Sequence, residues 1–196
     1  MPKIFSEADK NAIQERLMET GLACLEKKGY KASSVEEITR SAGIAKGTFY
    51  NFFPSKEHFY LQIMLSIRDK RRRELLDFFT SAEKPGRKKM EEFLLCYVQK
   101  KNVHHYFTGE ELALIFRKIP EERDKISRDS AAFAAELFEN LPKVNPRLNR
   151  QVAVNYLNLM ADFAAGLRRQ PVEGVQETLE FMARTLSAYI LGKDKI

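Results

Sequence analysis

The sequence predicts an all-α fold for a chain of 196 residues. Apolar side chains recur three and four positions apart along most of the chain, as they do on the buried stripe of an amphipathic helix. No run of five residues alternates convincingly enough to indicate a strand. Glycine or proline interrupts the periodic segments, so we expect helices joined by short turns. These interruptions lie at Gly29, Gly43, Pro54, Gly109, Pro120, Pro142 and Pro146.

Composition excludes several classes of protein. With 44% hydrophobic residues, 14 Phe and 7 Tyr, the chain can form a packed core and is neither disordered nor collagen-like. Its longest uncharged stretch, residues 151–161, is shorter than the roughly 18 residues that a membrane span needs. Cys24 and Cys96 are too few for a disulfide framework and share no metal-ligand spacing. The N-terminus lacks the apolar segment of a signal peptide. We therefore expect a soluble, cytoplasmic protein that needs no cofactor and no metal.

Capping signals delimit the first helices. Residues 9–28 carry a helical stripe of apolar side chains, and Gly29 follows as a natural C-cap. Ser34 and Glu37 have the spacing of a capping box and open a short helix. Gly43 interrupts that helix after about two turns.

The remaining helices follow from the same signals. A second short helix begins at residue 45 or 46 and ends near residue 52, before Pro54, and Ser55 caps a long helix. The chain changes character near residue 60, so we expect a domain of residues 6–66 and a larger helical domain of residues 67–196. The later helices are expected at roughly 87–103, 110–118, 121–141, 146–169 and 172–191.

Residues 34–56 have the pattern of a helix-turn-helix. Its turn needs a residue at positive φ, and Gly43 supplies one. The second helix combines a cation, a bare backbone patch, a hydroxyl, a phenol and an amide. Small and polar groups suit docking into the major groove of DNA, because bulk there would hold the backbone off the bases. The helix N-terminus at Ser34 offers N–H groups to a phosphate. The groups of the second helix belong to Lys46, Gly47, Thr48, Tyr50 and Asn51.

Net charge adds little to this hypothesis. The formal net charge is +6, yet residues 1–60 hold nine basic and eight acidic side chains. The excess lies at residues 61–100, which hold ten basic and six acidic side chains. A basic run such as residues 68–73 is typical of a solvated helix face.

Three motifs carry a more specific signal. They are Lys-Lys-Gly-Tyr at 27–30, Ser-Ser-Val-Glu-Glu-Ile at 33–38, and Ala-Gly-Ile-Ala-Lys-Gly-Thr-Phe-Tyr-Asn-Phe-Phe-Pro-Ser-Lys-Glu at 42–57. With them, residues 10–60 resemble the DNA-binding domain of the TetR family of transcriptional regulators. The rest of the chain fits that family's variable ligand-binding and dimerisation domain in length and helical character only.

The resemblance implies a role for each matching position. Lys46 and Thr48 would contact bases or backbone in the major groove, Tyr50 and Lys56 would hold phosphates, and Gly47 would allow close approach. Asn51 would serve either purpose.

Two positions depart from the family pattern. Ala45 stands where a capping Ser is common, and Phe52 stands where Tyr or His often contacts the DNA backbone. Both departures imply fewer phosphate anchors than usual.

The function implied is that of a homodimeric, ligand-responsive repressor of a palindromic double-stranded DNA operator. A small hydrophobic or aromatic inducer would bind the second domain, although a packed core accounts for most of its large apolar side chains. The candidate ligand-binding residues are Phe93, Tyr97, Phe107, Phe116, Phe133, Tyr156, Met160 and Phe163. Helices apolar on more than one face indicate a dimer through residues 150–169 and 172–191. The candidate interface residues are Tyr156, Met160, Phe163, Ala164, Leu179, Met182, Leu186 and Ile190.

Two alternatives come from other classes. One is a dimeric small-molecule binding protein whose helix-turn-helix no longer binds DNA, which the substitutions at Ala45 and Phe52 favour. The other is a helical enzyme with His104 or His105 as a base. Adjacent histidines on a helix point about 100° apart, which suits a metal site poorly. Since no phosphate loop, nucleophile elbow or catalytic triad spacing is present, we expect no enzyme.

Overall fold

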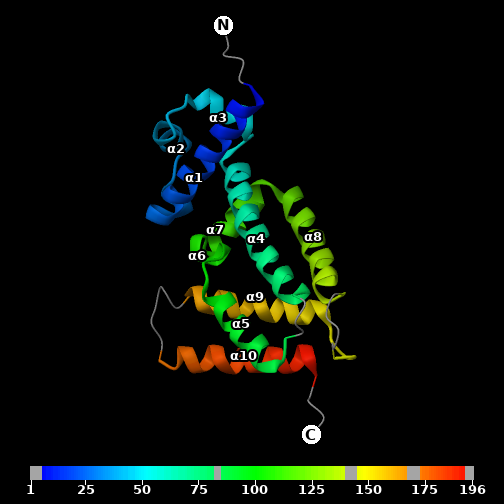
Figure 1. Ribbon diagram of the computed structural model, residues 1–196. Helices are drawn as coiled ribbons and strands as arrows, with labels where there is room; N and C mark the ends of the chain where they lie inside the picture. Colours follow the sequence, from blue (N-terminus) through cyan, green and yellow to red (C-terminus); the bar gives the residue numbers. More distant parts are fainter. Residues whose placement is uncertain (1–5, 82–84, 140–144, 167–172, 193–196) are drawn as a thin grey trace. The chain divides into compact units, whose positions relative to one another are not determined.

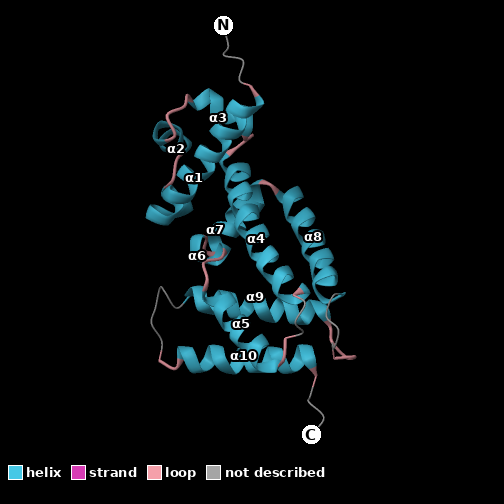
Figure 2. Cartoon of the chain, viewed as in Figure 1, coloured by secondary structure: helices cyan, strands magenta, loops and turns pink. Residues whose placement is uncertain are grey.

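The computed structural model describes residues 6–81, 85–139, 145–166 and 173–192. All regular structure in these residues is helical, which confirms the predicted all-α fold (Figures 1 and 2). Across the described ranges, no helix combines the length and apolar character needed to cross a bilayer. In chain order the helices are α1 (Glu7–Ala32), α2 (Val35–Ser41), α3 (Lys46–Phe52), α4 (Lys56–Thr80), α5 (Arg87–Gln99), α6 (Val103–Tyr106), α7 (Gly109–Lys118), α8 (Pro120–Glu139), α9 (Arg150–Gly166) and α10 (Val175–Leu191).

The chain divides into two compact units. The first unit comprises Met1–Ile67 together with Tyr106–Pro120, and the second comprises Arg68–His105 together with Glu121–Ile196. The expected boundary at residues 66 and 67 lies next to this division. However, α7 packs in the first unit, whereas the sequence had assigned it to the second domain.

In the first unit, α1 and α4 approach closely. The buried stripe of α1 consists of Ile13, Leu17, Gly21 and Leu25. A Cβ atom on Gly21 would lie 2.3 Å from the ring of Phe59 in α4, so only glycine fits there. The phenylalanine ring therefore packs directly on the backbone of α1.

Gly29 ends the regular part of α1, as predicted. Its φ of +77° and ψ of 173° are open to glycine and strained for other residues. The chain then turns through Tyr30, whose side chain is buried.

In the second unit, α5, α9 and α10 pack against one another pairwise. Their apolar stripes meet side chains from the second half of α4 and from α8, and form one core. Met160 is fully buried in this core, with an exposed fraction of 0%. Some predicted positions lie outside the described residues. They are the last residues of the helices predicted at 121–141 and 146–169, the first residue of the helix predicted at 172–191, and Pro142.

This packing corrects the predicted dimer interface. Met160, Ala164, Leu179, Leu186 and Ile190 are buried within one chain, because the stripe they form faces α5 and the neighbouring helices. They leave no surface for a partner. The other three candidates, Tyr156, Phe163 and Met182, are half-buried against the same core.

The candidate ligand-binding residues are also divided by the structure. Phe107 and Phe116 lie in the first unit, and Phe107 packs near Tyr30 and Tyr60 with ring centroids 6.5 Å and 6.1 Å apart. Both residues thus lie outside the second unit, and their role in ligand binding stays a prediction. The remaining six lie in the second unit, where they form or border the core.

The basic run at residues 68–73 was expected to form a solvated helix face. In the structure, this face is not uniformly exposed to solvent. Arg71 is only 6% exposed, and its guanidinium stacks 3.6 Å from the centroid of the Tyr97 ring. Arg72 pairs with Asp129 of α8 at 2.6 Å, and Arg68 pairs with the same carboxylate at 2.8 Å. Part of the positive charge of this run is therefore paired within the second unit.

Candidate nucleic-acid interface

The turn between α2 and α3 is built by local hydrogen bonds. Ser34 caps α2, since its hydroxyl accepts a hydrogen bond from the Glu37 N–H at 3.2 Å. Gly43 has a φ of +66° and closes the turn, as predicted. The Ile44 N–H donates to the Thr39 carbonyl at 3.0 Å, which fixes the path into α3.

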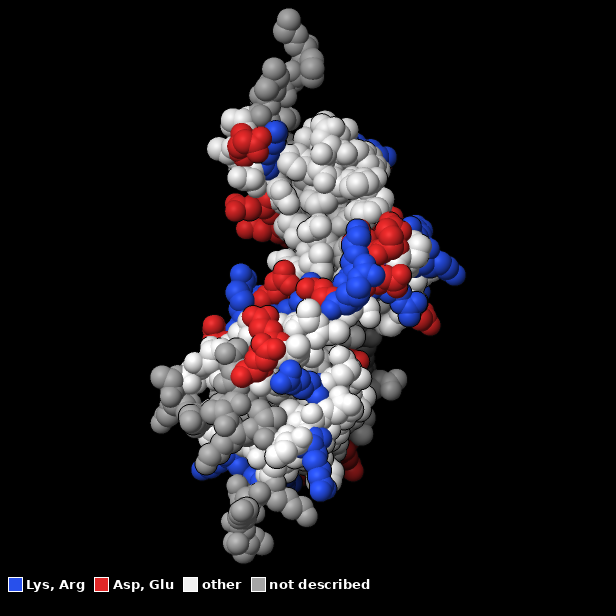
Figure 3. Space-filling view, turned by 90° about the vertical axis from the view of Figure 1, so that its right-hand side faces the viewer, with Lys and Arg blue, Asp and Glu red and all other residues white. Residues whose placement is uncertain are grey.

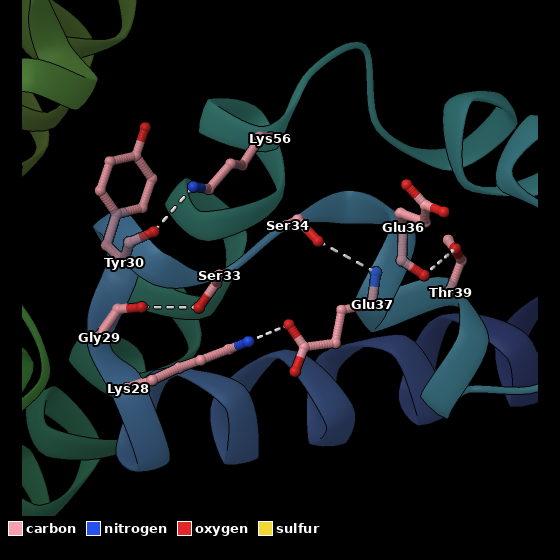
Figure 4. A network of polar contacts seen from close by, with 9 residues as sticks. All are labelled: Lys28, Gly29, Tyr30, Ser33, Ser34, Glu36, Glu37, Thr39 and Lys56. Carbon is pink, nitrogen blue, oxygen red and sulfur yellow. Dashed lines mark hydrogen bonds and ion pairs between the residues drawn. The ribbon is translucent and has the colours of Figure 1, made fainter.

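A second set of contacts secures the start of α2 to the end of α1 (Figure 4). The carboxylate of Glu37 forms an ion pair with Lys28, and this hydrogen bond lowers the pKa of Glu37. The Ser33 hydroxyl donates to the Gly29 carbonyl at 2.7 Å. The structure shows Glu37 bonded to a lysine of α1, so the capping-box spacing at Ser34 and Glu37 yields the serine cap together with a tie between helices.

The recognition helix α3 has one buried and one exposed face. Phe49 is fully buried, with an exposed fraction of 0%, and its ring lies 5.2 Å from that of Phe59. Tyr50, the next residue, is 48% exposed. Within a single turn of α3, one residue thus anchors the helix in the core and the next faces solvent.

The predicted DNA-contacting residues of α3 lie on its accessible side. Lys46, Gly47 and Asn51 are exposed and Thr48 is partly exposed. A Cβ atom on Gly47 would meet no atom within 4 Å, so packing within the chain does not require a glycine at this position. Ala45 is the N-cap of α3 and makes no side-chain capping hydrogen bond, as its methyl group dictates.

Lys56 contacts Tyr30 within the chain. Its ammonium donates a hydrogen bond to the Tyr30 carbonyl at 2.7 Å and lies 4.2 Å from the centroid of the Tyr30 ring (Figure 4). Burial lowers the pKa of this half-buried lysine. In this structure Lys56 joins the first turn of α4 to the end of α1, and its role as a phosphate anchor stays a prediction.

Glu57 is a buried carboxylate that sequence reasoning missed. It is 6% exposed, and its Oε1 accepts hydrogen bonds from the Tyr30 hydroxyl at 2.9 Å and from Lys118 Nζ at 2.7 Å. Burial opposes its ionisation, but the hydrogen bonds from Lys118 and Tyr30 prevail and hold its pKa at about 2. The sequence pattern does not reveal this ion pair, because Lys118 lies 61 positions further along the chain than Glu57.

On one face of the molecule, charge does not single out a docking surface. On the face drawn in Figure 3, Lys and Arg are interspersed with Asp and Glu. Within the described ranges, no group of three or more His, Cys, Asp or Glu side chains is placed to hold a metal ion. The case for a nucleic-acid interface therefore depends on the shape and side chains of α3.

Comparison with known proteins agrees with this geometry. Residues 17–63 match the family model described as bacterial regulatory proteins, tetR family. The uncharacterized HTH-type transcriptional regulator YuxN of Bacillus subtilis (strain 168) is 36% identical over 72 residues, which are 37% of this chain and 25% of that protein. The HTH-type transcriptional repressor DhaR of Mycobacterium sp. (strain GP1) is 27% identical over 90 residues, 46% of each chain.

The matched part thus spans between a quarter and about half of these two relatives. The fold likeness extends further. A solved structure of a protein assigned to the TetR family, from Rhodococcus sp., superposes with a TM-score of 0.65 at 12% identity, covering 92% of this chain and 98% of that one. TetR-family proteins are transcriptional regulators and not enzymes. Residues 17–63 therefore resemble the helix-turn-helix domain of bacterial regulatory proteins of the tetR family, and the described chain shares its fold with a solved structure assigned to that family.

Proposed function

We propose that this regulator is a homodimeric, ligand-responsive repressor that binds a palindromic operator through α3. The observation that carries the proposal is the two-sided character of α3. Phe49 fixes the helix from behind, while Lys46, Thr48 and Tyr50 stand on its accessible side. A short helix held this way can enter the major groove, where base edges are distinguishable.

Contacts to DNA phosphates and contacts to base edges would have different consequences for binding. Lys46 and Tyr50 carry groups that hydrogen-bond phosphate oxygens, which fix position and register. Thr48 has a hydroxyl and a methyl group, which suit base edges. In a symmetric dimer, the two copies of α3 would enter successive major grooves, with half-sites about 34–36 Å apart.

Repression is supported by the printed name of one relative, the repressor DhaR. Response to a ligand is supported by the continuity of α4, whose first part belongs to the first unit and whose later part belongs to the second. An inducer would bind the state that is unable to bind DNA more tightly, and DNA would weaken inducer binding to the same extent.

Dimerisation is supported by apolar side chains that the core does not cover. Val152 and Leu159 of α9 are 48% and 56% exposed, and Phe181 of α10 is 64% exposed. Val152 and Leu159 are seven positions apart and so share one face of the helix. These three exposed apolar side chains lie on α9 and α10, and we propose that they belong to the dimer interface in place of the buried stripe.

The test is selection of bound duplexes from a random DNA pool by purified protein at two salt concentrations. A recovered palindrome whose affinity falls steeply with added salt is the expected result, because phosphate contacts release counterions. Enrichment of no sequence at low salt would favour the alternative of a small-molecule binding protein that has lost DNA binding. Two observations favour that alternative: Ala45 makes no capping hydrogen bond, and the Lys56 ammonium is bonded to the Tyr30 carbonyl.

A further inference from the structure

The Glu57 carboxylate joins three helices of the first unit. It lies in the first turn of α4, accepts a hydrogen bond from the hydroxyl of Tyr30 at the end of α1, and pairs with Lys118 at the end of α7. Lys118 is itself 63% exposed in its side chain, while that of Glu57 is 8% exposed. The lysine therefore supplies the counter-charge of a buried carboxylate from the solvent side.

The packing of α3 depends on the same part of α4. Phe59, two residues after Glu57, packs on Phe49 of α3 at 5.2 Å and on Phe53 at 4.9 Å. Gly21 of α1 lies directly against the Phe59 ring. A shift of the first turn of α4 relative to α1 would therefore move the ring on which α3 rests.

The segment that carries Lys118 docks at this junction through other contacts as well. Phe107 packs against Tyr30 and Tyr60. Glu111 is 7% exposed, caps α7 by accepting from the Thr108 N–H at 2.9 Å, and also accepts from the Lys31 N–H at 3.4 Å. In the sequence, residues of the second unit precede and follow this segment.

We infer that Glu57 and Lys118 are positioning residues for DNA binding, which hold the first turn of α4 against α1 and thereby fix the presentation of α3. The inference rests on the proposed DNA-binding function. Neither residue lies on the accessible face of α3, so neither is assigned a contact with DNA. An ion pair between residues 61 positions apart thus joins α7 to the helix that follows the helix-turn-helix.

The test compares Lys118→Met with Lys125→Met in the full chain. Both variants remove one positive charge from a lysine that forms a 2.6–2.7 Å ion pair and is about equally exposed, at 63% and 58%. Lys125 pairs with Glu122, three positions earlier in α8, and belongs to the second unit. A general loss of charge attraction to DNA would affect both variants equally.

We expect Lys118→Met to weaken operator binding about tenfold or more, with an unchanged slope of log affinity against log salt, because no phosphate contact is lost. Lys125→Met should stay within about twofold of wild type. Lys118→Arg should restore affinity, and Lys118→Met should add little in a Glu57→Gln background, since the two residues act as one pair.

Amide hydrogen exchange provides a second readout that does not require DNA. Lys118→Met should speed exchange in the first turn of α4 and at the end of α1, and Lys125→Met should not. Equal exchange in both variants, together with equal operator affinity, would overturn the inference. If wild-type protein bound no DNA, the proposed function would fail while the exchange comparison would still decide the positioning role.

Discussion

Two neighbouring residues of α3 have different roles: one packs in the core and the other faces solvent. Phe49 is fully buried, and Tyr50 is 48% exposed with its ring 5.3 Å from that of Phe49. The exposed phenol is thus supported from below and keeps its hydroxyl available. Such support limits the conformational entropy that would be lost on binding a phosphate.

The hydroxyl of Tyr50 and the side chain of Thr48 should differ in their effect on DNA binding. Tyr50→Phe removes one hydrogen bond and keeps the ring, so operator affinity should fall by about 1 kcal/mol for every DNA sequence. Thr48→Ala should instead change the preferred base at one position. Binding to a panel of duplexes with single base substitutions distinguishes them. A uniform loss for Thr48→Ala would assign that residue to the backbone.

Acid should expose the contribution of Glu57 to stability. Its pKa falls from 4.5 to about 2 in the folded chain, so its stabilising effect is complete above about pH 4.5 and is lost as pH falls towards 2. The shift corresponds to stabilisation on the order of 3 kcal/mol. Urea unfolding between pH 5 and 2 should show a shallower loss for Glu57→Gln than for wild type. Parallel curves would show that other carboxylates cause the acid sensitivity.

At the scale of elements, two glycines in helices serve opposite purposes. A Cβ on Gly21 of α1 would collide with the Phe59 ring, whereas a Cβ on Gly47 of α3 would meet no atom within 4 Å. Alanine favours a helix over glycine by about 1 kcal/mol. Packing therefore explains the first glycine, and close approach to DNA is the proposed reason for the second.

Gly47→Ala should accordingly separate stability from function. We expect unchanged or higher thermal stability, by up to about 1 kcal/mol, and weaker operator binding because the methyl group holds α3 off the groove. Gly21→Ala should destabilise the fold by about 1–3 kcal/mol through overpacking. Thermal unfolding and operator titration of both variants make the comparison. Full operator affinity in Gly47→Ala would remove the close-approach role.

Elements with local signals were predictable from the sequence. Ser34 and Ser55 cap α2 and α4, and Gly29 and Gly43 adopt positive φ where the turns require it. These features depend on neighbours within a few positions. The docking of α7 in the first unit was not predictable, because it depends on contacts such as that of Lys118 with Glu57, 61 positions apart.

The same limit explains the error at α9 and α10. Both helices are apolar on more than one face, which indicates burial on more than one side but does not say which face meets the chain's own core. The stripe with Met160 and Leu186 faces inward, and Leu159 and Phe181 are exposed. Only the three-dimensional packing of α5 against both helices decides between them.

At the scale of the whole molecule, the exposed apolar side chains of α9 and α10 make a prediction about assembly. Leu159→Asp combined with Phe181→Asp should convert a dimer into a folded monomer, because both side chains are more than half exposed and leave the core intact. A charged group in an apolar interface lacks a partner and its desolvation disfavours association. Sedimentation equilibrium should show half the mass of the wild type, with an unchanged helical circular dichroism spectrum.

Operator binding should follow the loss of the dimer. A monomer places a single α3 in one half-site, so affinity for the palindrome should fall to that for an isolated half-site. Met160→Ala is the matched control, since it opens a cavity in the core, costs about 2–5 kcal/mol of stability, and leaves the exposed surface unchanged. A double variant that still sediments as a dimer would locate the interface away from Val152, Leu159 and Phe181, whereas a monomeric Met160→Ala would restore the buried stripe as a determinant of assembly.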